Sequence, residues 1–186
     1  MKMYTLIAGV NGVGKSSFSG ALEEELEDFG TIIDVDKITA DLGGNAIEGG
    51  RAALKMIDVC LEQEINFSQE TTLSGYKTEK TIREAKERGY YIRLYYIGLD
   101  GLDEHTERIA NRKAKGKHGI AEDVVRRRYE QRFASLERIL PLCDKAVFYD
   151  NYNNFVKVAE FNKGTLEFFN GYQPTWLSDL ASHLAS

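Results

Sequence analysis

The sequence GVNGVGKS at residues 9–16 fits the pattern GxxxxGK[ST] at every fixed position, and no other feature restricts the fold of this chain as strongly. Glycines let the backbone curl closely enough for successive N–H groups to point at one anion. The pattern functions where a buried strand leads into the loop and a helix leaves it, because the helix N-terminus also attracts negative charge. It therefore predicts a strand, a phosphate-binding loop and a helix near the N-terminus.

The flanking sequence meets this requirement. The apolar run Tyr4–Ala8 is typical of a strand buried on both faces of a parallel sheet, and we expect it to be the central one. In residues 16–28, Phe18, Leu22 and Leu26 recur at four-residue spacing, which favours a helix that ends at Gly30.

The polar groups of the loop each have an expected role in holding a nucleoside triphosphate. Lys15 would reach the β- and γ-phosphates, the Ser16 hydroxyl would hold Mg²⁺, and Ser17 would contact the region of the α-phosphate. The residues expected to bind the nucleotide are Gly9, Asn11, Gly12, Val13, Gly14, Lys15, Ser16 and Ser17.

Short apolar runs continue to alternate with helical patterns along the rest of the chain. Further strands are expected at residues 31–35, 65–69, 90–97 and 145–149. Helices are expected at residues 53–65, 78–88 and 124–140, with the glycine pairs 43–44 and 49–50 in loops. A C-terminal β-hairpin is expected at about 155–170. This order predicts a P-loop fold with three α/β/α layers and a mainly parallel five-stranded sheet, as one domain over residues 1–186.

Composition and charge exclude several classes of protein. The 186 residues, 42% hydrophobic and 28% charged, suit one packed globular domain. A net charge of -5 argues against a surface adapted to nucleic acid. Cys60 and Cys143 lack metal-ligand spacing and are interpreted as reduced thiols. The apolar stretch at residues 3–10 is too short to span a membrane, so we expect a cytoplasmic protein.

Acidic residues follow two of the expected strands. Asp36 ends the second strand, where a small-molecule kinase places the base that accepts a proton from the acceptor hydroxyl, and Asp34 would support the metal. A helix N-cap is the other interpretation of Asp36. Glu70 and Thr71 end the third strand at the same edge of the sheet, where they would contact the acceptor, unless Glu70 is a turn residue.

A basic stretch predicts a lid at about residues 108–122. Arg108 and Arg112 would stabilise the charge of the transferring phosphoryl group, and His118 would contact the acceptor. Arg128 and Arg132 share a face of the following helix, so one or both are expected to meet the nucleotide, with Arg128 also expected at the acceptor and a solvated helix face as the alternative.

Two other kinds of P-loop protein fit the sequence less well. A GTPase needs an NKxD element, and the sequence NKGT at residues 162–165 lacks the aspartate. An ABC-type ATPase is suggested by Leu73-Ser74-Gly75, but the rest of that signature is missing and no glutamate follows Asp100. A regulatory ATPase whose acceptor is water stays open.

The combination of these motifs resembles the zeta-toxin family of P-loop kinases and its chromosomal, non-toxin relatives. The phosphate loop, Asp34-Val35-Asp36, the sequence ETTLSG at residues 70–75 and the HGI at residues 118–120 that leads into Arg126-Arg127-Arg128 occur in the family's order. The resemblance implies transfer of the ATP γ-phosphate to a sugar hydroxyl, with UDP-N-acetylglucosamine the acceptor of the toxins.

The resemblance also implies roles for particular residues. It makes Asp36 the general base, Glu70 the strand-end acid, and Arg108 or Arg112 a γ-phosphate ligand, with Lys15 completing the catalytic set. Lys115, His118 and Arg128 are all candidates for the second lid arginine of the toxins. Toxicity does not follow from the resemblance, and the sequence shows no surface for an antitoxin-type partner.

Overall fold

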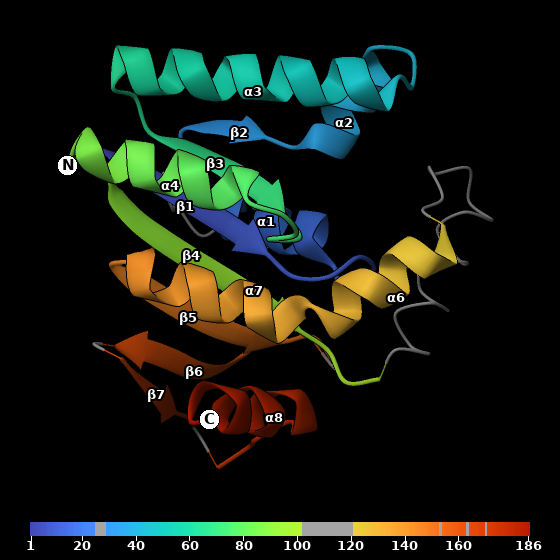
Figure 1. The fold of residues 1–186 in the computed structure, drawn as a ribbon, viewed down its shortest axis with the longest axis vertical. Coiled ribbons are helices and arrows are strands. Elements are labelled where there is room, and N and C mark those ends of the chain that lie inside the picture. Colours follow the sequence, from blue (N-terminus) through green and yellow to red (C-terminus); the bar gives the residue numbers. More distant parts are fainter. Residues whose placement is uncertain (25–28, 102–120, 153, 163, 170) are drawn as a thin grey trace.

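A single mixed sheet forms the centre of the computed structural model, which describes residues 1–24, 29–101, 121–152, 154–162, 164–169 and 171–186 (Figure 1). Seven strands lie in the order β2-β3-β1-β4-β5-β6-β7. They are β1 (Met3–Ala8), β2 (Thr31–Ile33), β3 (Phe67–Thr71), β4 (Tyr91–Gly98), β5 (Lys145–Asp150), β6 (Val156–Asn162) and β7 (Thr165–Phe168). The strands from β2 to β5 pair in parallel around β1, which confirms the predicted fold class and the central position of the first strand.

The sheet has more strands than the five predicted, because the hairpin continues it. β6 pairs antiparallel with β5, with a register shift between Phe148 and Tyr149, and β7 pairs antiparallel with β6. The sequence predicted the hairpin itself, but it did not predict that the hairpin would extend the sheet beside β5.

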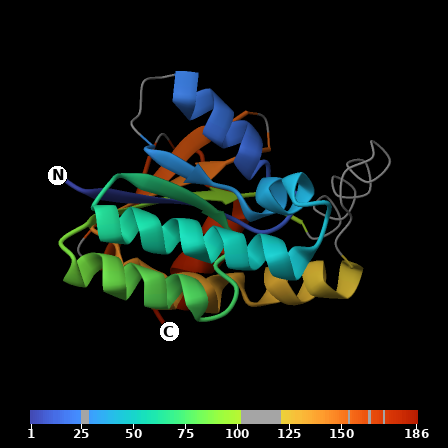
Figure 2. The ribbon, with the colours of Figure 1, turned by 90° about the horizontal axis from the view of Figure 1, so that it is seen from above.

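Helices cover both faces of the sheet (Figure 2). α1 lies on one face, and α3, α4 and α7 lie on the other. The helices are α1 (Lys15–Glu24), α2 (Val35–Asp41), α3 (Ala46–Gln63), α4 (Lys77–Glu87), α6 (Glu122–Glu130), α7 (Arg132–Ile139) and α8 (Thr175–Leu184), with a 3-10 turn at Leu140–Leu142. None of the helices in the described part of the chain is long and apolar enough to span a membrane.

The strand β4 shows why the central strands read as continuous apolar runs. Ile92, Leu94 and Tyr96 belong to the larger core beneath α3, α4, α7 and α8. Tyr95 and Ile97 point the other way, into the smaller core beneath α1. A strand covered on both faces has no polar side, because its alternating side chains enter two apolar layers.

The segment between β2 and β3 differs from its prediction. The glycine pair 49–50 was expected in a loop, and this was wrong, since both residues lie within α3. The N–H groups of Ile47 and Glu48 donate to Asn45 Oδ1, at 3.1 and 3.3 Å, so a good N-cap starts the helix ahead of the glycines. A Cβ on Gly49 would overlap the Thr39 side chain, and the close packing of α2 on α3 therefore requires a glycine there.

The helix α8 was not predicted, and its Trp176 packs against Tyr96 of β4 and Phe148 of β5. Trp176 is buried at 2% exposure, and its Nε1 donates to Asp150 Oδ1 at 2.8 Å. The backbone N–H of Trp176 donates to Asp100 Oδ1 at 2.6 Å, so a carboxylate caps the start of the helix. Its ring lies where Gly98 would carry a Cβ. These contacts fix the C-terminal helix to the ends of two central strands.

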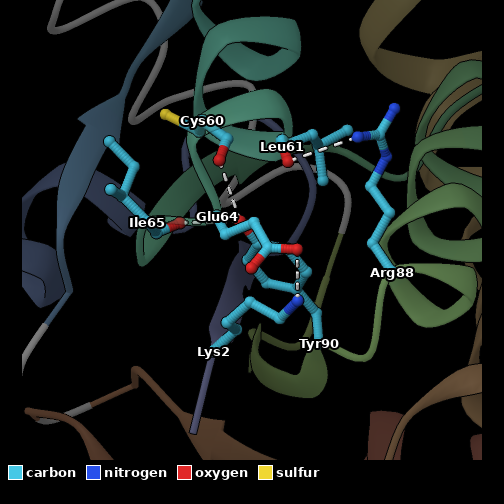
Figure 3. Close-up of polar contacts among 7 residues, drawn as sticks. All are labelled: Lys2, Cys60, Leu61, Glu64, Ile65, Arg88 and Tyr90. Carbon is cyan, nitrogen blue, oxygen red and sulfur yellow. Dashed lines mark hydrogen bonds and ion pairs between the residues drawn. The ribbon is translucent and has the colours of Figure 1, made fainter.

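The C-terminal end of α3 is fixed to residues that precede β1 and β4 (Figure 3). The Tyr90 hydroxyl lies 2.9 Å from the carbonyl oxygens of both Cys60 and Ile65. Glu64 takes a left-handed conformation at φ 55°, and its carboxylate pairs with Lys2 Nζ at 2.9 Å. Lys2 and Tyr90, which immediately precede β1 and β4, thereby fix the end of α3, and the Tyr90 hydroxyl adds to the backbone N–H groups of Glu64 and Ile65 that already donate to the Cys60 carbonyl.

We predict that Tyr90→Phe lowers the free energy of unfolding by about 1 kcal/mol, because the hydrogen bonding of the buried hydroxyl to the Cys60 and Ile65 carbonyl oxygens is lost. Urea unfolding followed by circular dichroism measures the change. Tyr76→Phe is the control, because Tyr76 is 73% exposed. Equal unfolding midpoints for Tyr90→Phe and wild type would contradict the assigned role of the hydroxyl.

Candidate active site

The phosphate loop has the backbone conformation that its glycines allow. Gly9, Gly12 and Gly14 all have positive φ, at 150°, 83° and 96°. A Cβ on Gly9 would overlap the carbonyl oxygen of Ile97, and one on Gly14 would lie 2.6 Å from Asn151 Nδ2. Side chains are therefore excluded from both positions by backbone conformation and by space.

The side chains of the loop make contacts within it. Lys15 Nζ donates to the carbonyl oxygens of Gly9 and Val10, at 2.9 and 3.2 Å. Outside the loop, Asn151 Nδ2 donates to the Val13 carbonyl oxygen at 2.8 Å. The residue immediately after β5 thus supports the loop, a role that the sequence analysis missed.

Glu70 lies beside the start of α1. The parallel pairing of β3 with β1 sets Glu70 opposite Ile7, two residues before the loop. Its carboxylate accepts hydrogen bonds from Ser16 Oγ at 2.9 Å and from Ser19 Oγ at 2.7 Å. Burial raises the pKa of Glu70, and the charge of nearby Asp34 adds to the rise, while the two serine hydroxyls oppose it.

The acids after β2 are arranged differently from the prediction. β2 ends at Ile33, so the expected continuation to Val35 was wrong. Asp34 is the N-cap of α2, and its Oδ1 accepts from the N–H groups of Asp36 at 2.9 Å and Lys37 at 3.2 Å. The capping role weighed for Asp36 therefore belongs to Asp34, because the helix starts two residues earlier. Asp36 lies exposed in the first turn of α2.

A cavity of about 360 Å³ brings these groups together. It is lined by Asn11 and Lys15 of the loop, by the carboxylates of Asp34, Asp36 and Glu70, and by Arg128. Arg128 Nη1 donates to Asn11 Oδ1 at 2.9 Å, so α6 reaches the loop across 117 residues of sequence. Burial lowers the pKa of Arg128, whereas the charge of Asp36 opposes this shift. The space joins a phosphate loop, carboxylates and an arginine.

Asp34 and Glu70 also line a second cavity of about 420 Å³, which Ser16 and Ser19 share. The two acids therefore stand between the two spaces. Within the described part of the chain, no group of three or more His, Cys, Asp or Glu side chains could hold a metal by themselves.

The other predicted site residues divide into three groups. Thr71 lines the first cavity, and its hydroxyl lies 3.4 Å from that of Thr78. Ser17 is exposed and lines neither cavity. Arg108, Arg112 and His118, like most of the predicted lid at 108–122, lie outside the described residues.

The segment that follows the predicted lid also differs from its prediction. The single helix expected over 124–140 is two helices, because Gln131 ends α6 and begins the next. Arg132 stacks on the ring of Tyr129 at 3.8 Å and donates to its carbonyl oxygen at 2.7 Å, so of these two arginines only Arg128 lines the first cavity.

Comparison with known proteins gives a relative for the sequence. No family model matches the chain. An uncharacterized protein of Haemophilus influenzae (strain ATCC 51907 / DSM 11121 / KW20 / Rd) is 34% identical over 126 residues, which cover 65% of this chain and 88% of that protein.

Solved structures share the fold. A chain of the PezAT chromosomal toxin-antitoxin system of the human pathogen Streptococcus pneumoniae has a TM-score of 0.69 at 15% identity, over 100% of this chain and 85% of its own. The complex of AvrRxo1-ORF1 and -ORF2 with ATP gives 0.67 at 15% identity, and this chain spans 64% of the matched one. The chain therefore belongs to the same family as the Haemophilus influenzae protein, and its fold is that of the zeta-toxin-like P-loop kinases.

Proposed function

We propose that this protein is an Mg²⁺-dependent kinase that transfers the γ-phosphate of ATP to a hydroxyl group of a small molecule. The observation that carries the proposal is the single cavity shared by Lys15, Asp36 and Arg128. Small-molecule kinases need a phosphate clamp, a base and a countercharge around one reacting group. A nucleotide sugar such as UDP-N-acetylglucosamine is the acceptor that the family resemblance suggests.

The residues beside the loop fit a magnesium ion. Mg²⁺ prefers oxygen ligands and keeps several waters, so it needs few groups from the protein. The Ser16 hydroxyl, the Glu70 carboxylate 2.9 Å away and the nearby Asp34 carboxylate supply such oxygens. When bound, the ion would neutralise charge on the β- and γ-phosphates.

The chain's own groups account for the transfer. Lys15 is held at the loop, where its ammonium attracts phosphate oxygens. Asp36 is exposed to the cavity and takes the proton of the acceptor hydroxyl as the hydroxyl oxygen attacks the γ-phosphorus and ADP leaves. Arg128 supplies positive charge beside the transferring group.

We predict that Asp36→Asn lowers phosphate transfer by about 10²–10⁴-fold, because the hydroxyl loses its base. The assay supplies γ-labelled ATP, Mg²⁺ and a panel of hydroxyl compounds that includes UDP-N-acetylglucosamine, and detects products by mass. Asp58→Asn is the control, because Asp58 is an exposed acid of α3 that lines neither cavity.

Two outcomes of this assay separate the kinase from the regulatory ATPase. A phosphorylated acceptor that is lost in Asp36→Asn supports the kinase. Labelled phosphate released equally by both proteins, with no acceptor modified, would favour the ATPase. One of the two similar structures comes from a toxin-antitoxin system and the other is a complex of two proteins. The assay is therefore run on protein checked for co-purified partners.

Lys15→Ala should reduce ATP turnover by at least about 100-fold, since a fixed positive charge on the transferring phosphates is lost. Steady-state kinetics measures the turnover, and binding of fluorescent adenosine separates base contact from phosphate contact. Lys55→Ala, at an exposed lysine of α3 that lines neither cavity, is the matched control. Wild-type turnover in Lys15→Ala would remove the loop from the mechanism.

Glu70→Gln tests the buried carboxylate through the pH dependence of stability. Burial raises the pKa of Glu70, so the folded protein holds this proton at pH values where the unfolded chain has released it. Wild-type stability should therefore fall as pH rises through that window, above the ordinary carboxyl pKa, and Glu70→Gln should lack this fall. Urea unfolding without Mg²⁺ measures both proteins, with Glu62→Gln on the exposed face of α3 as control. Parallel pH profiles for Glu70→Gln and wild type would contradict the shift.

A further inference from the structure

Gly49 and Gly50 lie next to each other near the start of α3, but the packing explains only one of them. Glycine inside a helix is destabilising relative to alanine, so each position needs a reason. Gly49 has one, since a Cβ there would overlap Thr39. Gly50 has none in the packing, because a Cβ there would meet no atom within 4 Å, and its φ is not positive. Neither the backbone nor a neighbouring side chain explains it.

The open space beside Gly50 is the cavity that holds Asp36. Gly50, Ala53, Leu54 and Ile57 follow one another at helical spacing and form an apolar wall of that cavity. The cavity is lined by the N-terminal part of α3, whereas the C-terminal end of the helix is held by Tyr90, which precedes β4 (Figure 3).

Another part of the lining has a different chemistry. It is built from the end of β3 and the start of α4, and it contains the hydroxyl-bearing residues Thr71, Thr72, Ser74 and Thr78. A ligand in this cavity therefore meets both an apolar surface and hydroxyl-bearing residues. At about 360 Å³, the cavity lies at the small end of the range for ligand pockets, and it has room for a sugar-sized ring.

We propose that Gly50 is a specificity-determining residue, whose missing side chain leaves the space in which one hydroxyl-bearing ring of the acceptor lies against α3. The inference rests on the proposed kinase function and extends it to the acceptor. The ring can belong to a free sugar or to the sugar of a nucleotide sugar. Both present an apolar face and a hydroxyl group to Asp36.

The test is a size series at position 50. Gly50→Ala and Gly50→Leu are compared with wild type in steady-state transfer from ATP to N-acetylglucosamine, glucose and UDP-N-acetylglucosamine, alongside phosphate release to water. We expect Gly50→Leu to lower kcat/KM for the acceptors at least about 100-fold, and Gly50→Ala about tenfold, in line with the discrimination of a methylene by an apolar pocket. Release to water should stay within about twofold of wild type.

Two controls separate occlusion from misfolding. Lys55→Leu puts the same side chain on an exposed position of the same helix and should transfer phosphate as wild type does. Thermal unfolding should show Gly50→Ala more stable than wild type, because alanine is the better helix former. An ATP-induced rise in melting temperature in Gly50→Leu shows that its loop is intact.

The outcomes distinguish this inference from the proposed function. Transfer by Gly50→Leu at the wild-type kcat/KM, or an equal loss in Lys55→Leu, overturns the role of Gly50 and leaves the kinase intact. A wild type that modifies no acceptor, with phosphate release unchanged in Asp36→Asn, removes the kinase and this inference with it. Transfer to free N-acetylglucosamine identifies the free sugar as the source of the ring, and transfer to UDP-N-acetylglucosamine alone identifies the nucleotide sugar.

Discussion

The close contact of the phosphate loop with the ends of β4 and β5 is the constraint on which the site depends. Gly9 lies against the carbonyl of Ile97, and Asn151 holds the carbonyl of Val13 from outside. With its position set by two neighbouring strands, the loop starts α1 at Lys15 and presents Ser16 to Glu70 on the strand at its other side. Parallel strands produce this arrangement because all their carboxyl ends lie at one edge.

Local signals allowed much of the fold to be predicted from the sequence. The loop motif, the five parallel strands and the hairpin depend on runs of residues close together in the chain, and the structure has all of them. Start and end points were less certain, because a cap can override a strand pattern. Asp34 shows this, since its side chain bonds two following N–H groups and ends β2 early. The helix α8 carries apolar residues at helical spacing that the sequence analysis did not use.

The site itself could be predicted only as a set of residues. Lys15, Asp36, Glu70 and Arg128 were named from motif and position, and the structure places them around one cavity. The contacts that orient them were not predictable, because they join distant parts of the chain. Arg128 meets Asn11 across 117 residues, and Asn151 meets Val13 across 138. Gly50 was assigned to a loop because adjacent glycines favour loops, and only the folded helix shows the space beside it.

The burial of Trp176 has a spectroscopic consequence. Its indole donates to Asp150, and the next residue in the chain, Asn151, holds the phosphate loop. It is the only tryptophan in the sequence. The chain thus carries one buried fluorophore whose hydrogen-bond partner is the neighbour of a loop-supporting residue, and its emission reports on this end of β5 without a label.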